Sequence, residues 1–204
     1  MAFYIFPRAI PVKDCNKLLK YCLKRAKWED ASTIAKGFTD TVGDKKDLKS
    51  SAQRDPKMRK TDVSFITDKD NIMNELVWGF IRDANKYFFN YKLDYFQAIQ
   101  FAKYQNGGHY DWHQDASGDY TIQTECRKLS LTMSLTDHNA YEGGLLEFYN
   151  GGKPLEHDKH NVSKDVKDQG SVIVFDSRDW HRVTPVTKGV RYSIVCWTVG
   201  PNFV

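Results

Sequence analysis

The second half of the chain consists of short β-type segments separated by glycine-containing turns, and this pattern restricts the fold most strongly. Residues 129–135 alternate between large apolar side chains and serine or threonine, as expected for a strand with two different faces. Further short apolar segments lie at 97–104, 145–149, 170–175 and 191–199. About eight short strands at this spacing predict a sandwich or jelly roll rather than an open parallel sheet.

The first half of the chain adds two amphipathic helices. One is expected at about 13–27, with an apolar stripe made of Cys15, Leu18, Leu19, Cys22, Leu23 and Ala26. The other is expected at about 71–89, with a stripe made of Ile72, Leu76, Phe80, Ile81, Ala84 and Phe88. Short strands are expected at 3–6 and 61–67, and both helices should pack on one face of the sheet. The predicted class is mainly β with flanking helices, a double-stranded β-helix (jelly roll) supported by N-terminal α-helices.

Length and composition predict one domain. The chain has 204 residues, of which 41% are hydrophobic, so a single domain over 1–204 is expected. Within it, 1–95 would form the helical support and a mobile loop, and 96–200 the jelly-roll core. The polar stretch 29–60 is interpreted either as a mobile surface loop or as a lid over the substrate, and the sequence leaves both open.

Charge and cysteine content point to a cytoplasmic protein in a reducing compartment. The net charge is +4, and much of the excess is in one polar stretch, interpreted as a solvated loop: Lys45, Lys46, Lys49, Arg54, Lys57, Arg59 and Lys60. The four cysteines include no C-x-x-C pair, which predicts free thiols. No signal peptide and no apolar run of membrane-spanning length are found, so we expect a soluble protein without a membrane partner.

The motif His113-Gln-Asp115 carries the first indication of chemistry. In an extended strand His113 and Asp115 project to the same face. A second histidine from elsewhere, His181, would complete a 2-His-1-carboxylate triad, which leaves positions open on a non-haem Fe(II). His-x-Asp alone is a weak signal. His109 and Asp111, close by, are interpreted either as loop residues or as residues that support the ligands, rather than as further ligands.

A carboxylate receptor is predicted next to this triad. Arg191 follows His181 by ten residues, enough for a turn and the start of an antiparallel return strand, and it shares a strand face with Ser193. A guanidinium and a hydroxyl on one face suit a carboxylate. The combination therefore predicts a dicarboxylate co-substrate, one end on the metal and the other on Arg191.

These residues together resemble a known family. The set of Tyr104, His113-x-Asp115, His181 and Arg191-x-Ser193 is similar to the Fe(II)/2-oxoglutarate oxygenase superfamily. Within it the chain most resembles the prolyl 4-hydroxylase-like enzymes of bacteria and their phages. Supporting segments are Gln100-Phe-Ala-Lys-Tyr104, Glu142-Gly-Gly144, His181-Arg-Val-Thr-Pro185 and Trp197. The match covers roughly residues 96–200.

The resemblance implies a role for each matching residue. His113, Asp115 and His181 would be the iron ligands, and no catalytic side chain is implied beyond this metal centre. Residues implied in binding 2-oxoglutarate are Arg191, Tyr104 and Ser193, and those implied in binding substrate are Arg127 and Trp197. Ser134 stands where many relatives carry tyrosine or threonine, and its role is left open. Many collagen-type relatives carry lysine at the position of Arg191.

The implied activity is hydroxylation of an unactivated C–H bond, with a prolyl residue of a protein or peptide as the favoured target and with release of succinate and CO2. Fe(II), 2-oxoglutarate and O2 are implied, and the resemblance also allows ascorbate. A phage-encoded protein acting in the host cytoplasm fits this interpretation. Neither the substrate nor the oligomeric state follows from the sequence.

Two other functions are weighed against this one. Oxidative demethylases of nucleic acid usually carry a second arginine where Trp197 stands, so nucleic acid is disfavoured as a partner. A non-catalytic jelly-roll binding module would not need a carboxylate receptor beside a metal triad.

Overall fold

The computed structural model describes residues 3–31, 55–66, 72–116, 125–149 and 167–203, and the backbone of three short strands at 33–34, 52–53 and 161–162. In chain order, its elements are β1 (Phe3–Phe6), α1 (Val12–Arg25), β2 (Glu29–Asp30), β3 (Thr33–Ile34), β4 (Ala52–Gln53), β5 (Arg59–Lys60), β6 (Asp62–Ile66), α2 (Ile72–Ala84), the π-helix η1 (Asn85–Phe89), β7 (Tyr95–Phe96), β8 (Ile99–Gln105), β9 (Gly108–His113), β10 (Glu125–Ser134), the 3-10 helix η2 (His138–Ala140), β11 (Tyr141–Gly143), β12 (Leu146–Tyr149), β13 (Asn161–Val162), β14 (Val172–Asp176) and β15 (Trp180–Pro201).

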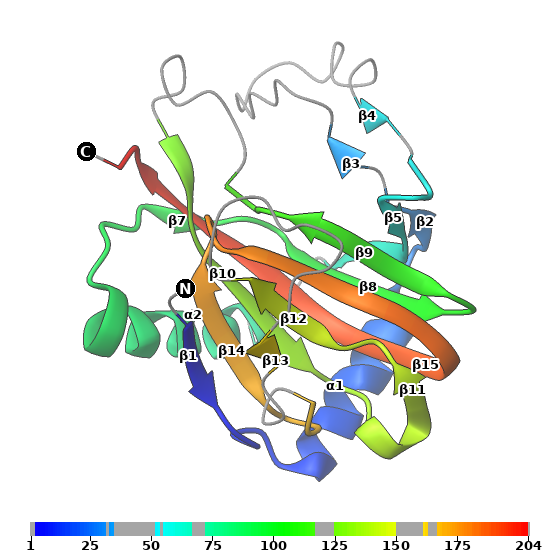
Figure 1. Ribbon diagram of the computed structural model, residues 1–204. Coiled ribbons are helices and arrows are strands. Elements are labelled where there is room, and N and C mark those ends of the chain that lie inside the picture. The colour runs from blue at the N-terminus through cyan, green and yellow to red at the C-terminus, as the bar shows by residue number, and fades with distance from the viewer. Residues whose placement is uncertain are drawn as a thin grey trace.

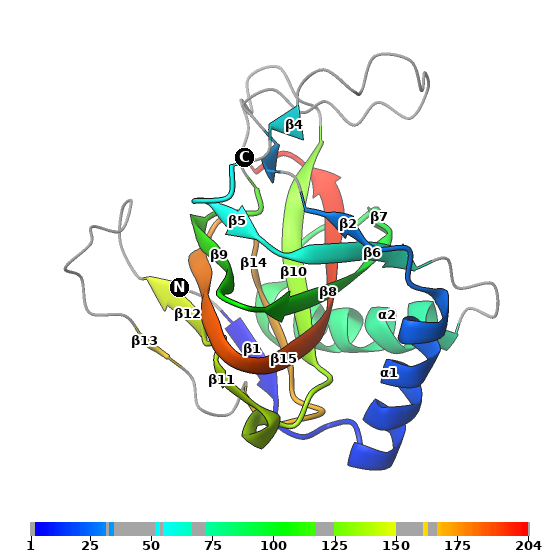
Figure 2. The same ribbon diagram turned by 90° about the vertical axis from the view of Figure 1, so that its right-hand side faces the viewer.

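Thirteen strands form one continuous antiparallel sheet that β15 folds into two layers. The major layer has the order β1-β14-β10-β15-β8-β6-β2, with β7 beside the end of β15. The minor layer joins β5, β9, β12, β13 and β11 to the first half of β15. Figure 2 shows β15 curving from one layer into the other. This arrangement confirms the predicted jelly roll with flanking helices.

The connection between His181 and Arg191 differs from the prediction of a turn followed by a separate return strand. A single strand, β15, contains both residues and bends between them. The bend contains Gly189, whose φ of +73° favours glycine and whose added Cβ would lie 2.1 Å from the Ala140 carbonyl oxygen. Because both halves of β15 keep strand partners, the chain changes layer without interrupting the ladder.

Both helices cover the same face of the major layer, as predicted (Figures 1 and 2). Their buried side chains share one core cluster with the strands; its members include Cys15, Cys22, Met73, Val77, Ile81, Phe101, Leu131, Met133 and Ile194. The predicted stripes need correction at three positions: Leu23 is 42% exposed, Ile72 is 62% exposed and Phe88 is 53% exposed. Phe88 lies in η1, where the wider π-helical turn shifts side chains away from the α-helical spacing.

In α2 the buried face is displaced by one residue from the predicted stripe. Met73 and Val77 are buried, whereas Ile72 is exposed and Leu76 is only partly buried against the core; Ile81 and Ala84 are buried as expected. The stripe with Ile72 and Leu76 and the stripe with Met73 and Val77 are both apolar. The spacing alone therefore did not define which face of α2 contacts the sheet.

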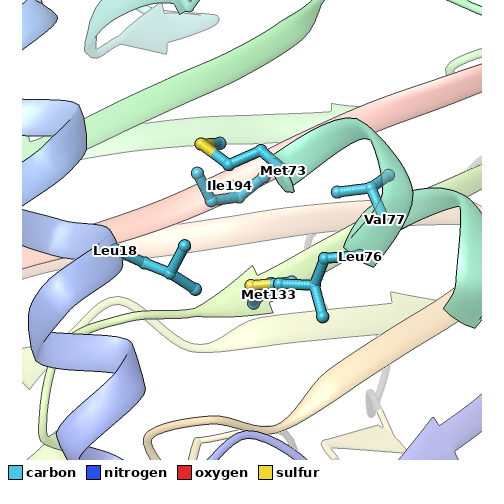
Figure 3. A pocket seen from close by; sticks show the side chains of 6 residues that line it. All are labelled: Leu18, Met73, Leu76, Val77, Met133 and Ile194. Atoms are coloured by element: carbon cyan, nitrogen blue, oxygen red, sulfur yellow. The ribbon is translucent and has the colours of Figure 1, made fainter. Parts of the chain in front are cut away.

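A narrow apolar gap remains between the helices and the major layer. It is lined by Leu18, Met73, Leu76, Val77, Met133 and Ile194 (Figure 3). The gap has no room for a water molecule and no polar lining atom, so it is a packing defect rather than a ligand site.

Several sequence expectations concern residues outside the described part of the chain. The proposed lid falls mostly there, at 32, 35–51 and 54, as does the turn at Gly151-Gly152. All four cysteines are buried, and none of them forms a disulfide within the described residues. None of the described helices has the length and apolar character that a membrane span requires.

Candidate metal centre

Three side chains with metal-binding atoms converge between the two layers. His113 is the last residue of β9 and pairs with His181 near the start of β15. The Nε2 atom of His113 lies 3.6 Å from Asp115 Oδ1, and the Nε2 atom of His181 lies 3.5 Å from Asp115 Oδ2. The ligand atoms of the three residues all lie within 4.8 Å of one another. This is the predicted set, assembled from two distant segments.

Asp115 reaches the cluster in a different way from that predicted. β9 ends at His113, and Asp115 lies in a bend just beyond it rather than in extended strand. The backbone N–H of Ala116 donates to the Ser177 carbonyl at 2.8 Å and fixes this bend. The carboxylate therefore meets the histidines because of a local bend held by the β14–β15 turn, and not because of strand alternation.

Both histidines are oriented by the same local contact. The Nδ1 atom of His113 lies 2.7 Å from the Asp111 carbonyl oxygen, and that of His181 lies 2.9 Å from the Asp179 carbonyl oxygen. A carbonyl can only accept, so each Nδ1 carries the proton. Each Nε2 atom then presents its lone pair toward Asp115, the arrangement found in metal-binding histidines.

Burial and charge set protonation states that suit a metal ligand. Burial, followed by the nearby His113, lowers the pKa of His181 to about 4, so this imidazole is neutral at pH 7. Burial acts to raise the pKa of Asp115, but the protonated forms of His181 and His113 and the Arg127 guanidinium outweigh it and hold the pKa well below its usual range. A neutral imidazole and an ionised carboxylate are the forms that coordinate metals.

Aromatic rings enclose the two histidines. Tyr110 stacks on His113 with ring centroids 3.4 Å apart and an interplanar angle of 11°. Phe175 lies edge-on to His181 at 4.7 Å, and Phe148 lies 6.1 Å from it. Sequence reasoning missed Tyr110. In a regular strand it would face away from His113, but the pairing of β9 with β15 is irregular between His181 and Val183.

The predicted carboxylate receptor lies deeper between the layers. Arg191 is 4% exposed and pairs across the ladder with Tyr104, whose ring centroid lies 5.3 Å from the guanidinium carbon. Its Nη1 donates to Ser193 Oγ at 3.3 Å. Ser193 in turn is the cross-strand partner of Ser134. No carboxylate of the described residues lies within 4.0 Å of the Arg191 guanidinium nitrogens.

Gly144 makes close packing around Arg191 feasible. Its φ is +60°, and an added Cβ would lie 2.8 Å from Val186 Cγ2 and 3.0 Å from Arg191 Cδ. The predicted Gly143-Gly144 turn therefore leaves the space that the arginine stem occupies. Any larger residue here would displace the stem.

The two residues implied in substrate binding lie together. The Arg127 guanidinium carbon lies 4.3 Å from the centroid of the Trp197 ring, and Arg127 Nε donates to Gln97 Oε1 at 2.9 Å. Trp197 is 8% exposed, and its buried Nε1 has no hydrogen-bond partner in the part of the chain that the structure describes. A buried donor without a partner is unfavourable, so a bound group that accepts this hydrogen would stabilise the site.

His109 and Asp111 are not part of the cluster, in agreement with the sequence interpretation. The ring nitrogens of His109 contact the carbonyl oxygens of Gly107 and Lys57. Asp111 Oδ1 accepts from the backbone N–H of Trp112. Among the described residues, His113, Asp115 and His181 form the one group of three that could hold a metal ion.

Comparisons with known proteins agree with this geometry. The model of the 2OG-Fe(II) oxygenase superfamily matches residues 99–199, which include all three members of the cluster and Arg191. A PKHD-type hydroxylase of Synechococcus sp. (strain CC9311) is 29% identical over 184 residues, covering 90% of this chain and 71% of that protein. A PKHD-type hydroxylase of Shewanella oneidensis is 33% identical over 101 residues, covering 48% of this chain but only 40% of that protein.

Solved structures share the fold at low sequence identity. A Pseudomonas putida prolyl-4-hydroxylase superposes with a TM-score of 0.65 at 17% identity, over 97% of this chain and 91% of that chain. A Trichoplax adhaerens prolyl hydroxylase, in complex with a hypoxia inducible factor peptide fragment, gives a TM-score of 0.68 at 14% identity, over 97% and 83%. The chain thus belongs to the 2OG-Fe(II) oxygenase superfamily, as a 2-oxoglutarate-dependent dioxygenase similar to prolyl hydroxylases.

Proposed function

We propose that this dioxygenase hydroxylates an unactivated C–H bond of a prolyl residue in a protein or peptide, and that it releases succinate and CO2. The observation that carries the proposal is a His-Asp-His cluster together with a buried arginine that has no acidic partner among the described residues. Neither the cluster nor the buried arginine alone would indicate this chemistry. Together they match a metal and a dicarboxylate bound side by side.

The cluster fits Fe(II) by the chemistry of its donors. His113, Asp115 and His181 offer two imidazole nitrogens and one carboxylate, the 2-His-1-carboxylate set that leaves positions open for other ligands on iron. Both histidines present Nε2, and the carboxylate is ionised. The three residues would therefore hold the metal without further rearrangement of protons.

The surroundings of Arg191 fit a carboxylate of 2-oxoglutarate. A buried guanidinium is costly unless an anion pairs with it, and arginine binds a carboxylate through a bidentate fork. Ser193 Oγ and the ring of Tyr104 lie beside the guanidinium. We infer that Arg191 and Ser193 bind the distal carboxylate and that Tyr104 packs alongside it.

The protein contributes positioning and shielding to the reaction. Iron, 2-oxoglutarate and O2, when bound, supply the oxidising chemistry, and ascorbate would serve only to keep the iron reduced. Tyr110, Phe148 and Phe175 surround the histidines and exclude water from them. No side chain needs to act as a general acid or base.

Arg127 and Trp197 form the surface we assign to the substrate. The indole face is suited to the apolar ring of proline, and Trp197 Nε1 is a buried donor available to a peptide carbonyl oxygen. The relatives named as prolyl hydroxylases support this choice of substrate.

Turnover of 2-oxoglutarate in the presence of proline-containing peptides and cell extract tests the proposal, with products identified by mass spectrometry. We expect succinate and a product 16 Da heavier in stoichiometric amounts, with the oxygen on proline. A parallel reaction with methylated oligonucleotides covers the demethylase alternative. Loss of a methyl group there, without peptide oxidation, would overturn the substrate assignment.

A further inference from the structure

Two serine hydroxyls connect the Asp115 carboxylate to the turn between β14 and β15. Ser130 Oγ donates to Asp115 Oδ2 at 2.7 Å, and Ser130 Oγ lies 2.8 Å from Ser177 Oγ. Both serines are 0% exposed. Neither belongs to the residues implied by the family resemblance, and their sequence positions are 47 residues apart.

The direction of these hydrogen bonds follows from the charge on Asp115. An ionised carboxylate can only accept, so the single hydroxyl hydrogen of Ser130 points to Asp115. Ser177 must then donate its hydrogen to Ser130. The result is an ordered chain from Ser177 through Ser130 to Asp115, and its last bond is charge-assisted and therefore the strongest.

The same turn also contacts the backbone next to Asp115 and the side chain of His181. The Ser177 carbonyl accepts from Ala116 N–H at 2.8 Å, next to Asp115, and the Asp179 carbonyl lies 2.9 Å from His181 Nδ1. Ser177 N–H donates to the Lys128 carbonyl at 3.0 Å, which joins the turn to β10. The turn thus fixes Asp115 and His181 relative to each other.

A pair of charged residues keeps the turn in place. Arg178 donates to Asp176 through its backbone N–H, Nε and Nη2, at 2.9, 2.9 and 2.6 Å. The hydroxyl of Tyr91 donates to Asp176 Oδ2 at 2.6 Å. Asp176 is 5% exposed while the Arg178 side chain is 45% exposed, so the carboxylate of this ion pair is shielded from solvent and the guanidinium is not.

We propose that Ser130, supported by Ser177, is a positioning residue that fixes the rotation of the Asp115 carboxylate and thereby sets the affinity of the cluster for its metal. The proposal rests on the proposed metal site. Groups that hydrogen-bond to metal ligands orient them, and their loss commonly reduces metal affinity about 10- to 100-fold.

The test measures metal binding directly, without turnover. Ser130→Thr and Ser130→Val have nearly the same shape and differ in the hydroxyl, so comparing them isolates the hydrogen bond. Anaerobic titration with Co(II) should give a Kd about 10- to 100-fold higher for Ser130→Val than for Ser130→Thr. The visible absorption spectrum of bound Co(II) should also change in the valine variant, because the geometry of the carboxylate changes.

Ser177→Ala tests the supporting hydrogen bond separately, because it removes the Ser177 hydroxyl and leaves Ser130 in place. We expect a Kd raised less than tenfold, and we expect Ser177→Ala to add little to the effect of Ser130→Val in the double variant, because the two residues act in series. Ser64→Ala is the matched control. Ser64 is 1% exposed and accepts from the Lys27 N–H at 2.9 Å, away from the cluster, so the Kd should not change.

The outcomes separate this inference from the proposed function. If the unaltered protein fails to bind Co(II), the metal site itself is wrong. If it binds Co(II), and Ser130→Thr and Ser130→Val bind it equally well with identical spectra, only the role of Ser130 is refuted. Circular dichroism on each variant checks the fold. If Ser130→Val does not fold, Ser177→Ala carries the test: an unchanged Kd for Co(II) in that variant would refute the proposed role of the two serines.

Discussion

The two faces of β10 are almost equally buried but chemically opposite. On the helix side, Leu129 and Leu131 are 0% exposed and pack in the apolar core under α1 and α2. On the side toward the minor layer, Ser130 is 0% exposed and Ser134 is 4% exposed. Burying a hydroxyl without a hydrogen bond costs about 1–3 kcal/mol. The apolar face therefore supports the fold, and on the polar face the Ser130 hydroxyl hydrogen-bonds with the cluster.

The largest effect is expected from removing a ligand on the polar side. In Asp115→Ala, 2-oxoglutarate turnover should fall to background, and metal affinity should fall by more than about 100-fold, since a ligand is lost rather than a supporting contact. Thermal unfolding should still be cooperative, because the helix-side core is intact. Turnover assays and Co(II) titration measure both effects, and full activity in this variant would refute the assignment of Asp115.

On the helix side the largest effect should be on stability. Leu131→Ala leaves a cavity under the helices and should lower the free energy of unfolding by about 2–5 kcal/mol. Because Leu131 faces away from the cluster, the KM for 2-oxoglutarate of the folded protein should not change. Urea denaturation and initial-rate kinetics test the two statements. A large rise in KM would show that the two faces are not independent.

Arg191→Met tests the carboxylate receptor. Loss of a charge-assisted fork should raise the KM for 2-oxoglutarate by about 100-fold, equivalent to about 2.7 kcal/mol. Without 2-oxoglutarate the variant should be at least as stable as the unaltered protein, because a buried unpaired cation is removed.

Arg182→Met is the control for this substitution. Arg182 contacts Glu147 at 2.6 Å through its Nε atom, so it already has an acidic partner. We expect its replacement to lower stability without raising the KM for 2-oxoglutarate. If both arginine variants changed KM equally, Arg191 would have no special role.

The smallest effects are expected at two glycines, with opposite signs. Gly144→Ala places a Cβ against the Arg191 stem at a φ of +60°, so it should destabilise the protein by about 1–2 kcal/mol and weaken 2-oxoglutarate binding.

Gly79 lies within α2 with nothing within 4 Å of an added Cβ. Gly79→Ala should therefore stabilise the protein by about 0.5–1 kcal/mol. Calorimetry distinguishes these results, and stabilisation by Gly144→Ala would contradict the packing described.

The sequence predicted features that depend on local spacing. The alternation in 129–135 and the helix at 13–27 follow from periodicity, and the pairing of His113 with a distant His181 follows from the family resemblance. All three agree with β10, α1 and the cluster. The division into 1–95 and 96–200 stays a prediction.

The features that the sequence did not predict depend on how strands meet in space. The stacking of Tyr110 on His113 needs the irregular pairing of β9 with β15. The hydrogen bond from Ser130 to Asp115 spans 15 sequence positions. In the sequence, Ser130 looks like an ordinary polar residue of an alternating strand, so nothing indicates this partner. The face of α2 that contacts the sheet could not be predicted because two apolar stripes, one sequence position apart, were both available.

Anaerobic titration with Fe(II) followed by 2-oxoglutarate tests the central claim most directly, because it requires the metal cluster and the Arg191 receptor in the same molecule. We predict a weak visible charge-transfer band that appears only when both are present, that is lost in His181→Ala, and that needs much more 2-oxoglutarate in Arg191→Met. No band in the unaltered protein at saturating Fe(II) and 2-oxoglutarate, or an equal band in His181→Ala, would contradict the account.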